Sequence, residues 1–185
     1  MEESRLIEAC VRGESWAQKN MYELYAPAMM SVCQRYAGNR DTARDLLHDG
    51  FIRLFAKIHT YSGAGSFNRW MKKVFVTSAL EHFRQKDVMR NSVNVEDIDF
   101  QTEDADVSLF EHLTLDDLMD CVTNLPDEYR TVFNMHAIEG YTHVEISREL
   151  EIHEGTSRSR YARARQMLQK MVMNKVDRMQ IVVGY

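Results

Sequence analysis

The sequence predicts an all-α protein made of two small helical domains. Only two prolines and eight glycines occur among 185 residues, whereas folds rich in β-strands need many more turn residues. The chain also carries twelve methionines, which form helices well and pack adaptably between them. Between residues 91 and 108 there are six acidic residues, no lysine or arginine, and few apolar residues. We therefore expect a flexible acidic linker between an N-terminal and a C-terminal domain.

Composition and charge exclude several classes of protein. The chain has 44% hydrophobic and 28% charged residues, which suits a globular protein with a core. No stretch approaches the roughly 18 consecutive apolar residues that a membrane span needs, and the first residues lack the pattern of a signal peptide. The cysteines, Cys10, Cys33 and Cys121, are scattered and odd in number, which argues against a disulfide framework and a zinc site. We expect a cytoplasmic protein without membrane insertion, metal or cofactor.

Helix signals in the N-terminal half predict four helices. Gly13 and Gly38 are placed to end helices, and Ser15 and Asp41 are placed to cap the helices that follow. The expected helices cover residues 4–12, 15–37, 41–59 and 67–86, with a glycine-rich loop at 61–66.

The third of these helices has two different faces. Its apolar stripe consists of Ala43, Leu47, Phe51, Leu54, Phe55 and Ile58. The opposite face carries Asp41, Asp45 and Asp49, with His48 alongside. That face is either a solvated surface or a binding face. A metal-dependent phosphohydrolase is disfavoured, because the other histidines show no helical ligand spacing, and we expect no catalytic residue.

The C-terminal half contains a helix-turn-helix pattern. After an amphipathic segment at 114–124, Pro126 opens a helix that Gly140 ends. Thr142 and Glu145 form a capping-box pattern for a helix ending near residue 150, and another helix begins by Thr156. From 155 to 175 the chain is basic and carries no acid. Two short helices with a tight turn, the second strongly basic, predict DNA binding.

A helical wheel divides the second helix into a packed stripe and a DNA-facing arc. The stripe contains Ser157, Tyr161, Ala164 and Leu168. The arc near the helix start, where helix-turn-helix proteins contact base edges, contains Thr156, Ser159, Arg160 and Arg163. Arg158, Arg165 and Lys170 are better placed for phosphates or a partner.

Both halves together resemble bacterial RNA polymerase sigma factors of the sigma-70 family, in the compact extracytoplasmic-function (ECF) group. The resemblance to sigma domain two lies in RYAGNRDTARDLLHDGFIRLF at 35–55 and SFNRWMKKVFVTSALEHFRQK at 66–86. The resemblance to domain four lies in LPDEYRTVFNMHAIEGYTHVEISRELEIHEGTSRSRYARARQMLQK at 125–170. The resemblance implies domain two at 1–88, a linker at 89–110, domain four at 111–175 and a short tail at 176–185.

The resemblance also implies roles for particular residues. The segment that binds the polymerase β′ subunit corresponds to Asp45, His48 and Asp49. The segment that melts and reads the −10 promoter element corresponds to Tyr61, Phe67, Arg69, Trp70, Lys73 and Arg84, where aromatic rings can stack on unpaired bases. The −35 reader corresponds to Thr156, Arg158, Ser159, Arg160, Arg163 and Arg165.

The implied partners are core RNA polymerase, through its β′ and β subunits, promoter DNA and an anti-sigma factor. Sigma factors are not enzymes, so no catalytic residue is implied. The chain departs from the family in the turn of the helix-turn-helix, where Glu151 occupies a position that is often glycine. Two other functions stay open from sequence: a dimeric helix-turn-helix regulator that binds operator DNA, and a sigma-like adaptor that binds polymerase but no promoter.

Overall fold

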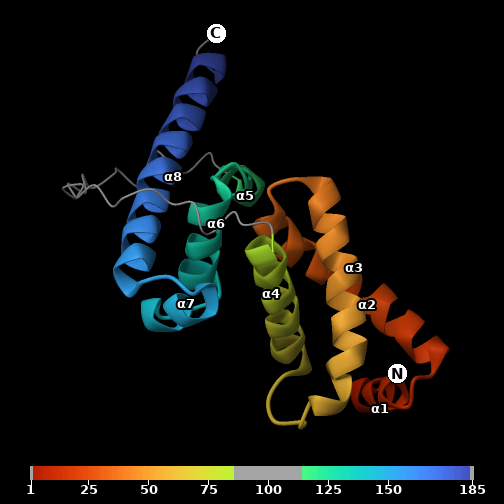
Figure 1. Cartoon of the computed structure of the whole chain (residues 1–185). Coiled ribbons are helices and arrows are strands. Elements are labelled where there is room, and N and C mark those ends of the chain that lie inside the picture. Colours follow the sequence, from red (N-terminus) through yellow and green to blue (C-terminus); the bar gives the residue numbers. More distant parts are fainter. Residues whose placement is uncertain (1, 86–113, 184–185) are drawn as a thin grey trace. The chain divides into compact units, whose positions relative to one another are not determined.

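The computed structural model describes residues 2–85 and 114–183, with side chains over 2–83 and 114–178. The chain divides into two compact units, Met1–Lys86 and Asp87–Tyr185 (Figure 1). Every regular element in the described residues is helical, which confirms the predicted all-α class. The expected linker at 89–110 lies outside the described residues.

The N-terminal unit is a bundle of four α-helices and a short 3₁₀ turn. Helix α2 packs against α1, α3 and α4, and α3 also packs against α4. The largest fully buried side chains of this core are Tyr36, Phe67, Phe75, Met21, Met29, Leu46, Leu54, Ile58 and Met71. Its elements are α1 (Glu3–Val11), α2 (Ser15–Ala37), α3 (Arg40–Lys57), η1 (Ile58–Thr60) and α4 (Phe67–Gln85).

Two expected helix caps differ in the structure. Helix α3 is capped by Asn39, whose Oδ1 accepts from the Thr42 backbone N–H at 2.8 Å, and the expected cap Asp41 lies in the first turn instead. Helix α2 begins at Ser15, but the capping position belongs to Glu14. The stop at Gly38 is as expected, with φ at +70°.

Close contact between α3 and α4 depends on Gly50. This residue is buried in α3, and a Cβ atom there would lie 2.3 Å from Cε1 of Phe75 in α4. The Phe75 ring also meets Phe51 edge-on, with 5.1 Å between the ring centroids. Because glycine has no side chain, the ring of Phe75 can pack directly on the α3 backbone.

The C-terminal unit contains the predicted helix-turn-helix and extends it with a long last helix. Helix α8 packs against α5, α6 and α7. It continues through residues 176–183, which we had expected to be a short tail, and Val176 on this extension is buried. The elements are α5 (Leu115–Thr123), α6 (Asp127–Phe133), the π-helical turn η3 (Asn134–Ile138), α7 (His143–Leu150) and α8 (Glu154–Val183).

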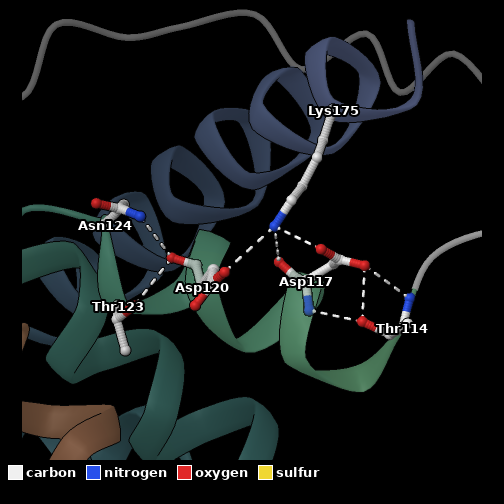
Figure 2. Close-up of polar contacts among 6 residues, drawn as sticks. All are labelled: Thr114, Asp117, Asp120, Thr123, Asn124 and Lys175. Carbon is white, nitrogen blue, oxygen red and sulfur yellow. Dashed lines mark hydrogen bonds and ion pairs between the residues drawn. The ribbon is translucent and has the colours of Figure 1, made fainter. Parts of the chain in front are cut away.

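Helices α5 and α8 are joined by Lys175, which directly precedes the extension of α8. Figure 2 shows its Nζ between two carboxylates of α5, 2.8 Å from Asp117 Oδ1 and 3.3 Å from Asp120 Oδ2. Asp117 also forms a reciprocal capping box with Thr114, which the sequence analysis missed. The hydrogen bonds from Lys175 and Thr114 lower the pKa of Asp117 to about 2. Lys175 of α8 therefore holds α5 against α8.

Candidate functional site

The acidic face of α3, consisting of Asp45, His48 and Asp49, is exposed to solvent. The buried residues of the same helix are Ala43, Leu46, Leu47, Gly50, Phe51 and Leu54. Ile52 continues the exposed row one turn after His48 and is 58% exposed. Acidic groups beside an exposed aliphatic side chain suit contact with a protein better than contact with DNA phosphates.

An ion pair connects this helix to α4. Arg53 of α3 pairs with Glu81 of α4, and the hydrogen bond that the Arg53 guanidinium donates to Glu81 raises the pKa of the guanidinium. Together with the Gly50–Phe75 contact, the pair fixes α4 relative to the acidic face.

An aromatic cluster lies where the loop after η1 enters α4. The ring centroids of Tyr61 and Trp70 are 5.5 Å apart, and each ring also contacts Phe67, at 5.2 Å for Tyr61 and 5.7 Å for Trp70. The Tyr61 hydroxyl donates to the Gly65 carbonyl at 2.7 Å and so closes the loop. Tyr61 and Trp70 are half-buried and keep part of their rings at the surface.

The structure corrects the expectation for Phe67. Its side chain is 1% exposed, because it packs between Tyr61, Trp70 and Tyr25 of α2. A buried ring cannot stack on an unpaired base in this conformation, so Phe67 supports the two rings beside it. The spacing contained a signal of this burial, because residue 67 lies four before Met71 and eight before Phe75, which are also buried.

The basic residues of α4 surround this cluster. Arg69 and Lys73 are exposed, as a DNA contact requires, and so is Lys72, which our site prediction omitted. The side chain of Arg84 lies outside the described residues.

The helix-turn-helix has the predicted local geometry. Thr142 Oγ1 accepts from the Glu145 backbone N–H at 3.2 Å, and Glu145 Oε2 accepts from the Thr142 N–H at 2.8 Å. This confirms the capping box at the start of α7. In the turn, Glu151 has φ +55° and ψ +39°, the left-handed conformation that we expected a non-glycine residue to hold.

Side chains at and before the first turn of α7 connect this helix to α8. The Nδ1 atom of His143 lies 2.9 Å from the hydroxyl of Ser157, which is fully buried in α8. The His143 ring stacks on His136, with 4.2 Å between centroids, and His136 meets Tyr161 of α8 edge-on at 4.5 Å. Burial first, then His136 and Arg158, lower the pKa of His143. These contacts, which the sequence did not predict, connect α7 and η3 to α8.

Most predicted DNA-reading residues of α8 are accessible. Arg158, Arg163 and Arg165 are exposed, while Thr156 and Ser159 are half-buried near the helix start. The Ser159 hydroxyl donates to the Thr156 carbonyl at 3.1 Å.

Arg160 is the exception and corrects our helical-wheel assignment. Only 3% of the residue is exposed, and its Nη2 lies 3.4 Å from Glu128 Oε2 of α6. It is part of the packed surface between α6 and α8 and not of the exposed arc that we predicted to face DNA. The spacing contained the signal, because residue 160 lies three after Ser157 and four before Ala164, both fully buried.

No helix among residues 2–85 and 114–183 is long and apolar enough to cross a membrane. Within the same residues, no group of three or more histidine, cysteine, aspartate or glutamate side chains could hold a metal ion.

Comparison with known proteins identifies both units. Residues 21–88 match the sigma-70 region 2 family, and residues 115–168 match the sigma-70 region 4 family. Both matches occur once, in the order expected of a compact sigma factor.

Named relatives align with most of the chain. An ECF RNA polymerase sigma-E factor of Haemophilus influenzae is 23% identical over 177 residues, covering 90% of this chain and 93% of the relative. The ECF RNA polymerase sigma factor SigW of Bacillus subtilis is 25% identical over 181 residues, covering 90% and 94%. The ECF RNA polymerase sigma factor SigE of Mycolicibacterium smegmatis is 30% identical over 157 residues, covering 83% of this chain and 60% of the relative.

A solved structure shares the fold. The sigma factor RpoE, solved in complex with the anti-sigma factor NepR from Bartonella quintana, superposes with a TM-score of 0.50 at 20% identity, covering 84% of this chain and 96% of that one. With region 2 and region 4 in one helical chain, this protein belongs to the sigma-70 family of RNA polymerase sigma factors, in its ECF group.

Proposed function

We propose that this alternative sigma factor acts through three surfaces: the acidic face of α3, the aromatic and basic start of α4, and the exposed side of α8 near its N-terminus. The acidic face binds core RNA polymerase, and the other two surfaces read the −10 and −35 promoter elements. The observation that carries the proposal is that acidic and basic side chains are exposed on different helices. The acids are exposed on α3, and the basic residues are exposed on α4 and α8.

The acidic face is the surface for core polymerase. Asp45 and Asp49 offer carboxylates to a basic partner, and the exposed Ile52 adds apolar contact area. By resemblance to the family, the partner is the β′ subunit. The Arg53–Glu81 pair and the Gly50–Phe75 contact then keep this docking surface in register with the −10 reader.

The proposed −10 surface consists of two aromatic side chains and three basic side chains at the start of α4 and in the loop before it. Tyr61 and Trp70 present partly exposed rings for stacking on unpaired bases, supported from below by the buried Phe67. Arg69, Lys72 and Lys73 follow the phosphates of the same strand.

The proposed −35 surface differs from the arc predicted by the helical wheel, because Arg160 is buried and Arg158 is exposed. Arg158 and Arg163 are the exposed arginines nearest the start of α8, and each can donate two hydrogen bonds to a guanine. Thr156 and Ser159 can contact bases or phosphates, while Arg165 and Lys170 contact phosphates. Arg160 holds α8 against α6 instead.

Three further properties belong to the same proposal. The chain works beside the polymerase in the cytoplasm, and it carries out no catalysis of its own. An anti-sigma protein controls it, by analogy with the relative solved in complex with NepR. The acidic segment at 89–110 tethers the two units. A dimeric operator-binding regulator is not favoured, because the N-terminal unit matches a sigma-factor region and not an effector domain.

The test is co-elution of the full chain with core RNA polymerase in gel filtration, followed by run-off transcription. The template is a pool of duplexes in which the −35 and −10 segments are randomised. We expect co-elution and transcripts that come from a subset of templates with two sequence elements. Co-elution without selection would identify an adaptor. Tight DNA binding by the chain alone, with a two-fold symmetric footprint, would identify a dimeric regulator.

A further inference from the structure

Helix α8, to which we assign −35 recognition, begins with an acid at the end that carries the proposed base-reading residues. Glu154 is the first residue of the helix, and the next acid in the sequence is Asp177. Between them are four arginines and two lysines, which are Arg158, Arg160, Arg163, Arg165, Lys170 and Lys175. A carboxylate in such a position is repelled by every phosphate that the helix approaches, so it opposes the binding of DNA in general.

Glu154 engages the side chain of Arg158 along one edge of the guanidinium. Its Oε1 accepts from Nη2 at 2.5 Å and from Nε at 3.1 Å. The pair is at the surface, with 65% of the Arg158 side chain and 38% of the Glu154 side chain exposed. This side-on geometry leaves the donors on the Nη1–Nη2 edge of Arg158 for another acceptor.

The remaining edge of Arg158 has the shape that a guanine requires. Two parallel N–H donors match guanine O6 and N7 in the major groove. The neighbouring carboxylate accepts hydrogen bonds and donates none, so on DNA it fits an exocyclic amino group, which cytosine presents as N4 and adenine as N6. The pair as a whole therefore complements a guanine next to a base with an amino group in the major groove.

We propose that Glu154 is a specificity-determining residue of the −35 reader, which orients Arg158 toward a base edge and penalises DNA that offers the carboxylate no amino donor. The proposal rests on the assignment of α8 to −35 recognition. An isolated surface ion pair contributes little to folding, so the effect is expected in DNA selection and not in stability.

The removal of the carboxylate charge has a defined consequence. In Glu154→Gln the Arg158 side chain loses its charged partner and is free to turn to the nearest phosphate. Affinity for non-cognate duplex then rises, and the dependence of log K on log salt becomes steeper by about one unit. The preference for an amino-bearing base at one −35 position falls, by about tenfold.

The experiment uses holoenzyme assembled from core polymerase and the full-length chain. The probe is a duplex pool randomised at −35, with the −10 segment taken from templates that the wild-type holoenzyme selects. Wild type, Glu154→Gln, Arg158→Ala, Arg163→Ala and Asp177→Asn are compared by sequencing of bound duplexes and by salt titration of one non-cognate duplex. Asp177→Asn is the matched control, because it removes the same charge from an exposed site on the same helix, about 35 Å away at 1.5 Å per residue.

We expect Glu154→Gln to lose the preference at one −35 base pair, adjacent to the base pair whose preference Arg158→Ala loses. Asp177→Asn should select the same sequences as wild type. If Arg158→Ala loses a preference and Glu154→Gln matches Asp177→Asn, the proposal for Glu154 is overturned and α8 remains the −35 reader. If wild-type holoenzyme selects no −35 sequence, or Arg158→Ala, Arg163→Ala and wild type all select alike, the assignment of α8 is itself overturned, and the role of Glu154 with it.

Discussion

Arg160 of α8 and Glu128 of α6 form an ion pair inside the C-terminal unit, with 3.4 Å between Nη2 and Oε2. The Arg160 side chain is 4% exposed and that of Glu128 is 23% exposed. This buried arginine thus holds α8 against α6, while Arg158, Arg163 and Arg165 of the same helix remain exposed to solvent.

We predict that Arg160→Ala destabilises the C-terminal unit by on the order of 3 kcal/mol, because it leaves the Glu128 carboxylate without its partner and opens a gap between α6 and α8. Circular dichroism melting of the full chain measures the loss. Both tryptophans, Trp16 and Trp70, lie in the N-terminal unit, so their fluorescence reports that unit separately and is expected not to change. An unchanged melt would mean that the pair does not support the fold.

The exposed Arg163 is expected to behave in the opposite way. Arg163→Ala weakens selection at one −35 base by about 1–3 kcal/mol if the side chain donates twice to guanine, and leaves the melt unchanged because the side chain packs against little. Competition binding of holoenzyme to duplexes that differ at single −35 positions measures this preference. Equal loss at every position would assign Arg163 to a phosphate.

Reversal of the acidic face by Asp45→Lys with Asp49→Lys is expected to abolish binding to core polymerase, since a basic partner then meets like charge. Both positions are exposed and opposite the buried stripe of α3, so the melt should stay within about 0.5 kcal/mol of wild type.

A pull-down with core polymerase measures this binding. The matched control is Glu2→Lys with Glu8→Lys, which reverses two exposed acids of the same unit in and beside α1. Equal retention of polymerase by both double variants would show that the α3 face is only solvated.

The C-terminal unit is expected to lose stability as the pH falls from 7.5 to 5.5. The pKa of His143 lies below its ordinary 6.5, owing to burial and then to His136 and Arg158. Below pH 6.5 the unfolded chain therefore takes up a proton at this residue before the folded chain does, and the proton favours unfolding. The full contribution of the neutral ring is present above that pH.

Thermal melts at three pH values test this, with His143→Gln as the comparison. The variant removes the titrating ring, so its melting temperature should fall less between pH 7.5 and 5.5 than that of wild type. A parallel fall in both proteins would assign the pH dependence to other groups.

Gly50→Ala sets two effects against each other. Alanine favours the helix by about 1 kcal/mol, but its Cβ would lie 2.3 Å from the Phe75 ring, and overpacking of this kind typically costs about 1–3 kcal/mol. We expect net destabilisation of the N-terminal unit in urea unfolding followed by tryptophan fluorescence. In a Phe75→Leu background, Gly50→Ala should reduce the free energy of unfolding by less than it does in the wild-type background. Higher stability in Gly50→Ala would show that α4 moves away without cost.

Much of this protein is encoded in short stretches of its sequence. Capping by Thr142 and Glu145, the stop at Gly38 and the periodic apolar residues of α3 involve residues within a few turns of one another, so pattern alone predicts them. For the same reason the exposure of Asp45, His48 and Asp49 could be foreseen, because the opposite side of the same helix is apolar.

Spacing could have indicated that Phe67 and Arg160 are buried, but only the tertiary structure shows which residues cover them. A helical wheel gives the angle of a side chain around its own axis, but not which other element covers that angle. Phe67 is covered by Tyr25, more than forty residues earlier, and Arg160 is paired with Glu128, thirty-two residues earlier. Long-range packing places this aromatic ring and this arginine in the core, and so determines which of their neighbours remain exposed at the surface.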